Sequence, residues 1–571
     1  MAATAVLFPP LTMRYLIGKT VSVLGDTLHV LLLEHTRLES GQDSGVPASM
    51  AIPRSDLPGA PAIVIGQPGS FVEVALPVGS VLGMVISASI QDLSAQPTSH
   101  LNGSGKRMLE VLVIGTLSAD RGFQRGSEVL PTIGANVYAV PLEMLEAMRA
   151  VEAKGRQLVT LGKLSNLPGQ PAVVNLDALL SRHLAVLGQT GAGKSWTVAA
   201  LLQQITKFPH ASTILLDLHG EYGKAFGSEA SHLSAVDLEL PFWLMSADEM
   251  IDICIERNDA LAPLQMGKFK ELLQEVKEAN RDNRELGIPK ITVDTPVYFE
   301  FQRLIDEMRR LDSEIVLVNL VRTHGPLYGQ FSRSIMRIES RLNDRRYDLI
   351  FNPQTFKTSA SMEALFRKIL GEEAAPKKLV VLDLSPLPFE IRPPVISLIL
   401  RCLFDFTYWY KRKHGRSYPV SVFCDEAHTY LNDQDPTHKS SRLSAERIAK
   451  EGRKYGISLG VITQRPREIS STILSQCNSF LCLRISNPDD QQYIRNLLPD
   501  SMKGIMSMIS TLRRGELLVV GDAVMMPTRI TVDPPNPSPD SRDVSFADEW
   551  SKPHAPIDVA GVLTMWRRQG L

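Results

Sequence analysis

The sequence predicts an α/β protein whose core is a mostly parallel sheet, preceded by a smaller domain of antiparallel β-structure. Two observations predict this class. From about residue 175, short apolar segments rich in Leu and β-branched residues alternate with helix-compatible segments, which is typical of a parallel sheet covered by helices. Residues 1 to about 150 instead contain several short strand-like segments separated by Gly, Pro, Ser and Asp, which is typical of a small barrel or sandwich.

A helical insertion interrupts this core, and an extended arm follows it. Residues 266–286 place Phe269, Leu272, Leu273 and Val276 at helical spacing, with charged residues on the other face. The segment after Pro527 is rich in Pro, Asp and Ser and cannot sustain regular structure for long. The sequence therefore predicts four parts: an N-terminal β-barrel at 1–150, an α/β core at 151–244 and 351–526, a helical insertion at 245–350, and a C-terminal arm at 527–571.

The composition limits which partners and which cellular compartment are expected. The 571 residues include 61 Lys and Arg against 62 Asp and Glu, a formal net charge of −1, so any contact with nucleic acid must be local, as in a pore lining. The five cysteines form no C-x-x-C pair, and we expect buried thiols in a reducing compartment and no cysteine metal site. No signal-like N-terminus and no apolar run approaching about 18 residues is present, so we expect a soluble, cytoplasmic protein without a membrane partner.

One octet matches the phosphate-binding loop pattern G-x-x-x-x-G-K-[ST] at every fixed position. It follows an apolar strand and precedes a helix-compatible segment, so that its backbone N–H groups and the helix N-terminus face bound phosphates. We expect Lys194 to reach the β- and γ-phosphates of ATP and Ser195 to bind Mg²⁺, with Thr197 as a further nucleotide-site candidate. The octet is Gly188, Gln189, Thr190, Gly191, Ala192, Gly193, Lys194 and Ser195.

An acidic pair ends a later apolar strand. Residues 420–424 are apolar apart from one Ser, and Asp425 and Glu426 follow them directly, at the strand end where open α/β folds bind ligands. We expect Asp425 to join the Mg²⁺ shell and Glu426 to position and polarise the attacking water. By itself the pattern also fits a solvated carboxylate pair; the phosphate loop about 230 residues earlier favours the catalytic interpretation.

Two further elements bear on nucleotide chemistry. Gln464 ends the next predicted strand, where its amide is expected to contact the γ-phosphate or the water; it also fits a polar loop residue before Pro466. The helix predicted at 441–455 carries an apolar stripe and an outward basic face. That face is either solvated or part of a subunit interface that donates one arginine to a neighbour's γ-phosphate, and spacing does not choose between these. Its basic residues are Arg447, Lys450, Arg453 and Lys454.

Together these residues resemble the HerA family, of the bacterial type, within the FtsK–HerA group of ring ATPases. The resemblance covers most of the chain, and its motifs follow one another in the family's order. They are Arg182-His183 before the phosphate loop, Asp217–Tyr222, Pro241–Ser246, Asp425–His428, Glu451–Gly456 and Thr463–Pro466.

The resemblance implies a RecA-like P-loop core, a small N-terminal barrel, and a homohexameric ring that moves double-stranded DNA through its central pore by ATP hydrolysis. It implies that Asp425 and Glu426 form the Walker B pair, that Gln464 is the sensor, and that Arg453 is an arginine finger acting in trans. It adds Arg182 and Asp217 to the nucleotide site. It also implies that the C-terminal arm crosses a neighbouring subunit.

Members of this family usually act with an effector. The resemblance implies either a NurA-like nuclease, as in DNA end resection, or a sirtuin-like NADase or nuclease, as in anti-phage defence. An alternative is a nucleotide-regulated hexameric platform that scaffolds and activates an effector with little translocation. A third possibility, a conjugation or secretion pump, shares the motifs but is disfavoured by the lack of an apolar spanning segment.

Overall fold

The computed structural model describes most of the chain. The described residues are 14–38, 43–47, 51–52, 63–64, 66–91, 106–118, 122–140, 144–145, 148, 156–165, 169–235, 238–256, 262–280, 283, 286–318, 321–498, 506, 508–541, 544–552 and 557–567. They divide into two compact units. The first comprises 1–201, 463–467 and 477–534, and the second comprises 202–462, 468–476 and 535–571.

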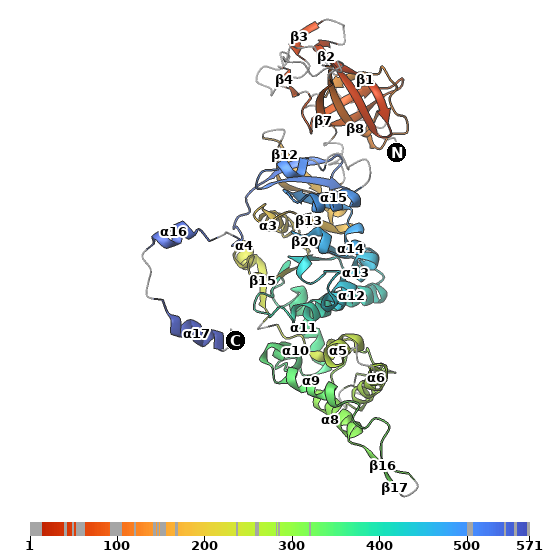
Figure 1. Cartoon of the computed structure of the whole chain (residues 1–571), viewed down its shortest axis with the longest axis vertical. Helices are drawn as coiled ribbons and strands as arrows, with labels where there is room; N and C mark the ends of the chain where they lie inside the picture. The colour runs from red at the N-terminus through yellow and green to blue at the C-terminus, as the bar shows by residue number, and fades with distance from the viewer. Residues whose placement is uncertain are drawn as a thin grey trace. The chain divides into compact units, whose positions relative to one another are not determined.

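The N-terminal part of the first unit is a closed antiparallel barrel, drawn in red and orange in Figure 1. Strand β2 pairs with β1 on one side and with β8 on the other, which closes the order β2-β1-β10-β6-β7-β8. Alternate side chains, including Ile17, Val30, Val74, Val85 and Val111, are fully buried and fill its interior. The small barrel predicted from the sequence is confirmed. Its strands are β1 (Tyr15–Leu24), β2 (Thr27–Leu38), β6 (Phe71–Ala75), β7 (Ser80–Gln91), β8 (Lys106–Ser118) and β10 (Asn136–Ala139).

The core is an eleven-stranded sheet, with parallel pairing in its centre. In the first unit, β13 (Leu184–Leu187) pairs parallel with β21 (Ser479–Leu483). Antiparallel pairing continues from β21 through β22 (Glu516–Gly521), β23 (Thr528–Val532) and β11 (Leu158–Leu164) to β12 (Pro171–Asn175). The predicted α/β class with a parallel-dominated sheet is therefore confirmed, with an antiparallel extension.

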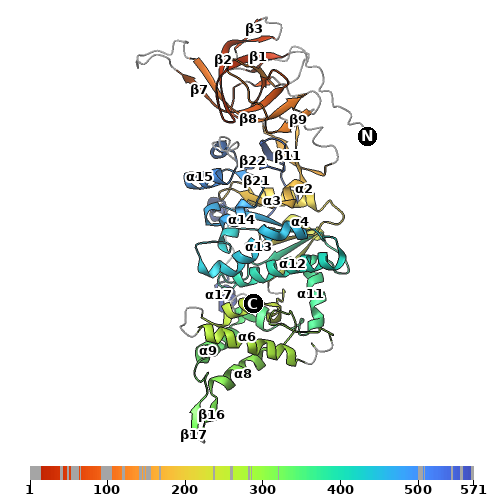
Figure 2. The ribbon, with the colours of Figure 1, turned by 90° about the vertical axis from the view of Figure 1, so that its right-hand side faces the viewer.

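The second unit contains the remaining strands, all parallel. Their order is β20 (Ile457–Thr463), β19 (Val420–Cys424), β14 (Thr213–Asp217), β18 (Leu379–Asp383) and β15 (Ala230–Ser234). Because the strands are parallel, their carboxyl ends share one edge. The long helix α12 (Arg392–His414) packs against α13 (Lys439–Tyr455), as Figures 1 and 2 show. Within the described residues, we find no helix with the length and apolar character needed to cross a membrane.

The insertion predicted at 245–350 is mainly helical but also contains a β-hairpin. Its helices are α5 (Ala247–Cys254), α6 (Ala262–Ala279), α8 (Phe301–Asp312), α9 (Ser332–Leu342) and α10 (Asp348–Phe351), and the hairpin lies between α8 and α9. The hairpin β16 (Ile315–Val318) and β17 (Val321–His324), which the sequence did not predict, projects beyond α8 in Figures 1 and 2. Short β-branched runs of this kind cannot be distinguished from helical ends by periodicity alone.

The insertion is tied to α12 by a buried ion pair within the second unit. Glu249 receives the backbone N–H of Ser246 in a capping box at the start of α5. The same carboxylate accepts hydrogen bonds from Ser397 at 3.0 Å and Arg401 at 2.9 Å. Both side chains have several hydrogen-bond partners. These hydrogen bonds offset the free-energy cost of removing Arg401 and Glu249 from water.

The C-terminal arm begins later than the sequence predicts. The sequence predicts the arm at 527–571, but residues 528–532 form β23 inside the sheet. The alternation in Thr-Arg-Ile-Thr-Val suits a strand with one buried side, occupied by Ile530. Beyond it, the arm contains α16 (Phe546–Ser551) and α17 (Val559–Arg567), neither of which has a buried residue.

We predict that Gly521→Ala destabilises the protein, because Gly521 has φ +109° and a Cβ there would lie 1.9 Å from the carbonyl oxygen of Asn478. The expected cost is about 2–4 kcal/mol, measured as a lower melting temperature. The matched control is Gly267→Ala on the exposed side of α6, where nothing lies within 4 Å and the melting temperature should stay equal or rise. Equal melting temperatures for the two variants would contradict the close approach of β22 to Asn478.

Candidate nucleotide-binding site

The phosphate loop leaves a fully buried strand and enters a helix. All four residues of β13 are inaccessible, and α3 (Lys194–Ile205) begins within the loop. Gly191 has φ +74° and Gly193 has φ +110°, backbone conformations that side chains with a Cβ rarely adopt. A Cβ on Gly188 would lie 2.8 Å from the Cβ of Leu483. Each of these three glycines is thus required by conformation or by close packing.

Three segments of the first unit hold the loop backbone. The N–H of Gly188 donates to the carbonyl of Thr463 at 3.3 Å, and that of Gln189 donates to the carbonyl of Arg484 at 3.0 Å. The carbonyl of Ala192 accepts the N–H of Gly515 at 3.0 Å. The loop is therefore preorganised before any ligand is bound, with the positive end of the α3 dipole behind it.

Side chains reinforce this arrangement. The hydroxyl of Thr190 donates to the amide oxygen of Gln464, which brings the predicted sensor to the phosphate loop. The amide oxygen of Gln189 accepts the backbone N–H of Ser486 at 3.0 Å. Thr197 is fully buried and its hydroxyl donates to the carbonyl of Gly193 at 3.0 Å, so it supports the loop from below.

Arg182 lies at the other end of β13 from the phosphate loop. Its guanidinium pairs with Asp522 at 3.2 Å, and Asp522 also accepts from the side-chain amide of Asn478 at 3.1 Å and lies 3.5 Å from Arg125. A four-residue strand separates Arg182 from the loop by roughly 13 Å. A nucleotide role for Arg182 stays a prediction.

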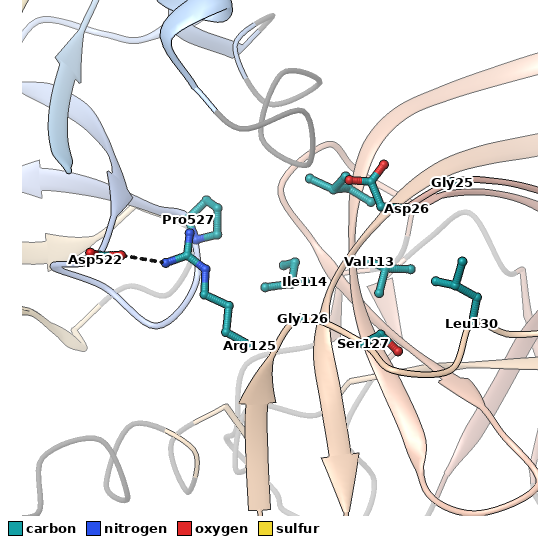
Figure 3. A pocket seen from close by; sticks show the side chains of 11 residues that line it. Gly25, Asp26, Val113, Ile114, Arg125, Gly126, Ser127, Leu130, Asp522 and Pro527 are labelled. Atoms are coloured by element: carbon teal, nitrogen blue, oxygen red, sulfur yellow. Dashed lines mark ion pairs between the residues drawn. The ribbon is translucent and has the colours of Figure 1, made fainter. Parts of the chain in front are cut away.

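A cavity of about 620 Å³ adjoins the Arg125–Asp522 pair (Figure 3). In Figure 3 the Arg125 side chain points from the barrel toward Asp522. The cavity has no glycine cradle at a helix start, so it is not the phosphate site. Its lining consists of Gly25, Asp26, Leu112, Val113, Ile114, Arg125, Gly126, Ser127, Leu130, Asp522 and Pro527.

In the second unit, the predicted acidic pair ends β19. Asp425 is almost completely buried, and its carboxylate accepts the N–H of Glu426 at 3.0 Å. The hydroxyl of Tyr430 donates to the Asp425 carbonyl at 2.9 Å and braces the turn. Glu426 has φ +42°, a left-handed conformation that is costly for a residue with a side chain. This turn directs the Glu426 carboxylate to 3.3 Å from Nδ1 of His428.

Like charges surround Asp425. Burial, and then the neighbouring carboxylates of Glu426, Asp217 and Glu221, raise the pKa of Asp425 well above its usual value. A cation near this edge would offset that repulsion. Within the described residues, no group of three or more His, Cys, Asp or Glu is arranged to hold a metal ion. A metal would therefore need ligands from a bound substrate as well.

Asp217 has a structural task at the end of β14. One carboxylate oxygen accepts the N–H groups of His219, Gly220 and Glu221 at 3.2, 2.9 and 3.3 Å, and the other accepts that of Tyr222 at 3.0 Å. Burial raises its pKa even so. Its predicted nucleotide role stays a prediction, since the structure shows it building the turn after β14.

The sequence analysis missed Asp383 at the same edge. Asp383 ends β18 in register with Asp217, and its charge also raises the pKa of Asp217. It accepts the backbone N–H of Ser385 at 2.9 Å. The signal was present in the sequence, because residues 379–383 are an apolar strand ending in Asp, the same pattern that identified Asp425.

The basic residues of α13 differ in whether they pair with other side chains of the chain. Arg447 lies 4.3 Å from the centre of the Phe404 ring and 3.6 Å from Asp405, and Lys450 lies 3.6 Å from Glu446. Arg453 is exposed and, within the part of the chain that the structure describes, makes no ion pair. Arg453 is thus better placed than Arg447 or Lys450 to reach another molecule.

The fold and the phosphate loop define a P-loop ATPase, and comparisons with known proteins show which proteins the chain resembles. The model "Helicase HerA, central domain" matches residues 159–403. The chain is 27% identical over 391 residues to the DNA double-strand break repair helicase HerA of Sulfurisphaera tokodaii, covering 68% of this chain and 72% of that protein. It is 23% identical over 505 residues to a probable helicase of Methanocaldococcus jannaschii, covering 85% and 90%. Over its central part the chain is therefore similar to HerA helicases, and it is an ATP-hydrolysing enzyme.

Solved structures that match part of the chain include VirB4 of Thermoanaerobacter pseudethanolicus, with a TM-score of 0.44 at 17% identity, covering 66% of this chain and 97% of that one. Another is the plasmid coupling protein TrwB in complex with an ATP analogue, with a TM-score of 0.42 at 13% identity, covering 67% and 91%.

We predict that Asp217→Asn destabilises the protein. The substitution puts an amide NH₂ where one carboxylate oxygen accepts backbone N–H groups, so donors face donors in a buried turn. The expected loss is about 1–3 kcal/mol, seen as a lower melting temperature without nucleotide. Asp306→Asn on the exposed side of α8 is the control and should melt within about 1 °C of the wild type. An unchanged melting temperature in Asp217→Asn, with weakened ATP binding, would instead assign Asp217 to the nucleotide.

Proposed function

We propose that this protein is an ATP-driven translocase of double-stranded DNA that works as a homohexameric ring. The preorganised phosphate loop carries the proposal. Its left-handed glycines and three backbone anchors form a cradle at the start of α3. Such a cradle suits the β- and γ-phosphates of ATP, with Lys194 and Ser195 at its helical end.

We propose that the acidic edge of the second unit takes part in ATP hydrolysis, because carboxyl ends of neighbouring parallel strands are where α/β sheets bind ligands. Asp425 and Ser195 are an oxygen donor set that suits Mg²⁺, which supplies charge neutralisation of the phosphates when bound. The crowding of carboxylates around Asp425 supports a cation there. Glu426, held in its left-handed turn beside His428, positions the attacking water, and Gln464 contacts the loop through Thr190.

The ring is supported by two surfaces. Arg453 is exposed, whereas Arg447 and Lys450 are paired within their own chain, which favours Arg453 as the arginine that reaches a neighbour's γ-phosphate. The arm beyond β23 exposes Phe546, Trp550 and Trp566, large apolar side chains that suit packing against another copy.

We further propose that the ring drives an effector, either a NurA-like nuclease or a sirtuin-like NADase, in DNA end processing or anti-phage defence within the cytoplasm. The relatives named DNA double-strand break repair helicases support the first of these settings. The alternative, an assembly platform with little translocation, is favoured by the net charge of −1 and by the exposed apolar hairpin, where Ile315, Leu317 and Val321 are each more than half exposed.

If the protein is a DNA motor, linear double-stranded DNA should stimulate its ATP turnover. Glu426→Gln and Lys194→Ala should each lower turnover at least about 100-fold, because phosphoryl transfer depends on charge placement at this site. Glu363→Gln on the exposed side of α11 (Met362–Leu370) is the control and should retain turnover. Full turnover in Glu426→Gln would show that the site is misassigned. Turnover indifferent to DNA in the wild type would favour the platform.

If Arg453 acts on a neighbouring subunit, two inactive variants should complement each other within one assembly. Arg453→Ala alone should lose turnover about 100-fold or more, since a trans arginine stabilises the transferring phosphoryl group. Co-expression of Arg453→Ala with Glu426→Gln should restore part of the turnover, because an intact arginine then meets an intact site at some interfaces. Arg447→Ala should remain active. A mixture that stays as inactive as either variant alone would refute the trans role.

A further inference from the structure

The end of α12 and the loop after it have an unusual composition. Residues 406–419 read Phe-Thr-Tyr-Trp-Tyr-Lys-Arg-Lys-His-Gly-Arg-Ser-Tyr-Pro and contain no acidic residue. They hold three of the chain's twelve tyrosines and one of its five tryptophans, together with four Lys or Arg and a His. In a chain of net charge −1, this is a local concentration of positive charge among aromatic rings.

The rings divide into a half-buried group and one exposed ring. Phe406, Tyr410 and Tyr418 pack together, with centroids of Tyr410 and Tyr418 5.4 Å apart and those of Phe406 and Tyr418 5.9 Å apart. Trp409 faces outward and is 62% exposed. The guanidinium of Arg412 lies 5.6 Å from the Trp409 ring centre and donates to the Tyr408 hydroxyl at 3.0 Å. Trp409 and Arg412 thus form a cation–aromatic pair open to solvent.

Helix α13 adds a further cation to this surface. The Lys411 ammonium donates to the Lys454 carbonyl, and the rings of Tyr408 and Tyr455 are 5.0 Å apart, so the two helix ends are joined. We call the exposed residues Trp409, Arg412, Lys413, His414, Arg416 and Lys454 the α12 basic surface.

Within the described residues, no cation of the α12 basic surface makes an ion pair. Elsewhere in the second unit, exposed cations such as Arg309, Arg310 and Arg367 are paired with Asp or Glu. Of the last two turns of α13, only Glu451 is acidic.

Stabilisation of a helix end explains only part of this surface. Cations in the last turn of α12 interact favourably with the negative end of the helix dipole. Arg416 lies beyond the helix, however, and Lys454 belongs to a different one. Neither does the dipole account for an exposed tryptophan beside an arginine. Unneutralised cations spaced around an aromatic ring match the repeated phosphates and the sugar or base faces of nucleic acid.

We propose that the α12 basic surface binds the sugar–phosphate backbone of DNA, as a contact additional to the pore. The inference rests on the proposed function, since it assumes that DNA is the polymer on which the motor acts. Lys413, Arg416 and Lys454 contact phosphates, and Trp409, held by Arg412, packs against a sugar or a base.

The test is fluorescence anisotropy of the full chain with a labelled linear duplex, at salt concentrations between about 50 and 200 mM. Lys413→Gln combined with Arg416→Gln should weaken binding about tenfold and reduce the slope of log affinity against log salt by about two. Trp409→Leu should weaken binding without changing the slope, because the ring carries no charge. The control, Arg309→Gln with Arg310→Gln, removes two exposed cations that are paired, and its affinity should stay within about twofold of the wild type.

The outcomes separate this inference from the proposed function. One outcome is that Lys413→Gln/Arg416→Gln retains the wild-type affinity and slope together with DNA-stimulated turnover. That result would overturn the assignment of DNA binding to this surface and would leave the proposed motor function unaffected. A wild-type protein that neither binds duplex nor responds to it would overturn both. Displacement of DNA by polyglutamate at equal charge would assign the surface to an acidic polypeptide, and loss of assembly mass in the variant would assign it to a subunit contact; both results overturn the proposal.

Discussion

The phosphate loop can exist only because no side chain separates it from the strands beneath it. Gly188 lies directly against Leu483, and Gly193 packs beside the backbone of Gly515. This contact allows the loop backbone to bond with Thr463, Arg484 and Gly515, which are about 270 to 325 residues away along the chain. These hydrogen bonds hold the glycines in their left-handed conformations. The N-terminus of α3 stays free to face a polyanion.

The second constraint is electrostatic. Asp217, Asp383 and Asp425 end three neighbouring strands, and parallel pairing places all three at one edge. Asp217 is neutralised in part by four backbone N–H groups, whereas Asp425 is buried among other carboxylates with its pKa raised. A cation bound at this edge would offset the repulsion among these carboxylates.

Helix α12 connects the insertion with the surface that we assign to DNA. Its buried half holds Arg401 against Glu249 of the insertion, and its exposed end carries Trp409 and Arg412. The pair Arg401–Glu249 is largely buried and has several hydrogen-bond partners, so loss of one member would leave an uncompensated charge. The insertion is thus joined by these contacts to the same helix that presents the basic surface.

The amino-acid sequence by itself determined the barrel, the α/β class, the phosphate loop and the acidic pair, because each depends on neighbouring residues: alternation along a strand, glycines at fixed spacing, or an apolar run that ends in carboxylates. Only the tertiary structure decided which distant groups meet. It placed Arg182 with Asp522 at the far end of β13, turned Asp217 toward its own backbone, and paired residues 528–532 with β22. It also set the register that puts Asp383 beside Asp217, although the strand ending in Asp383 is visible in the sequence. It also distinguished the exposed Arg453 from the paired Arg447. Such outcomes depend on strand order and register between segments hundreds of residues apart, and no local pattern encodes them.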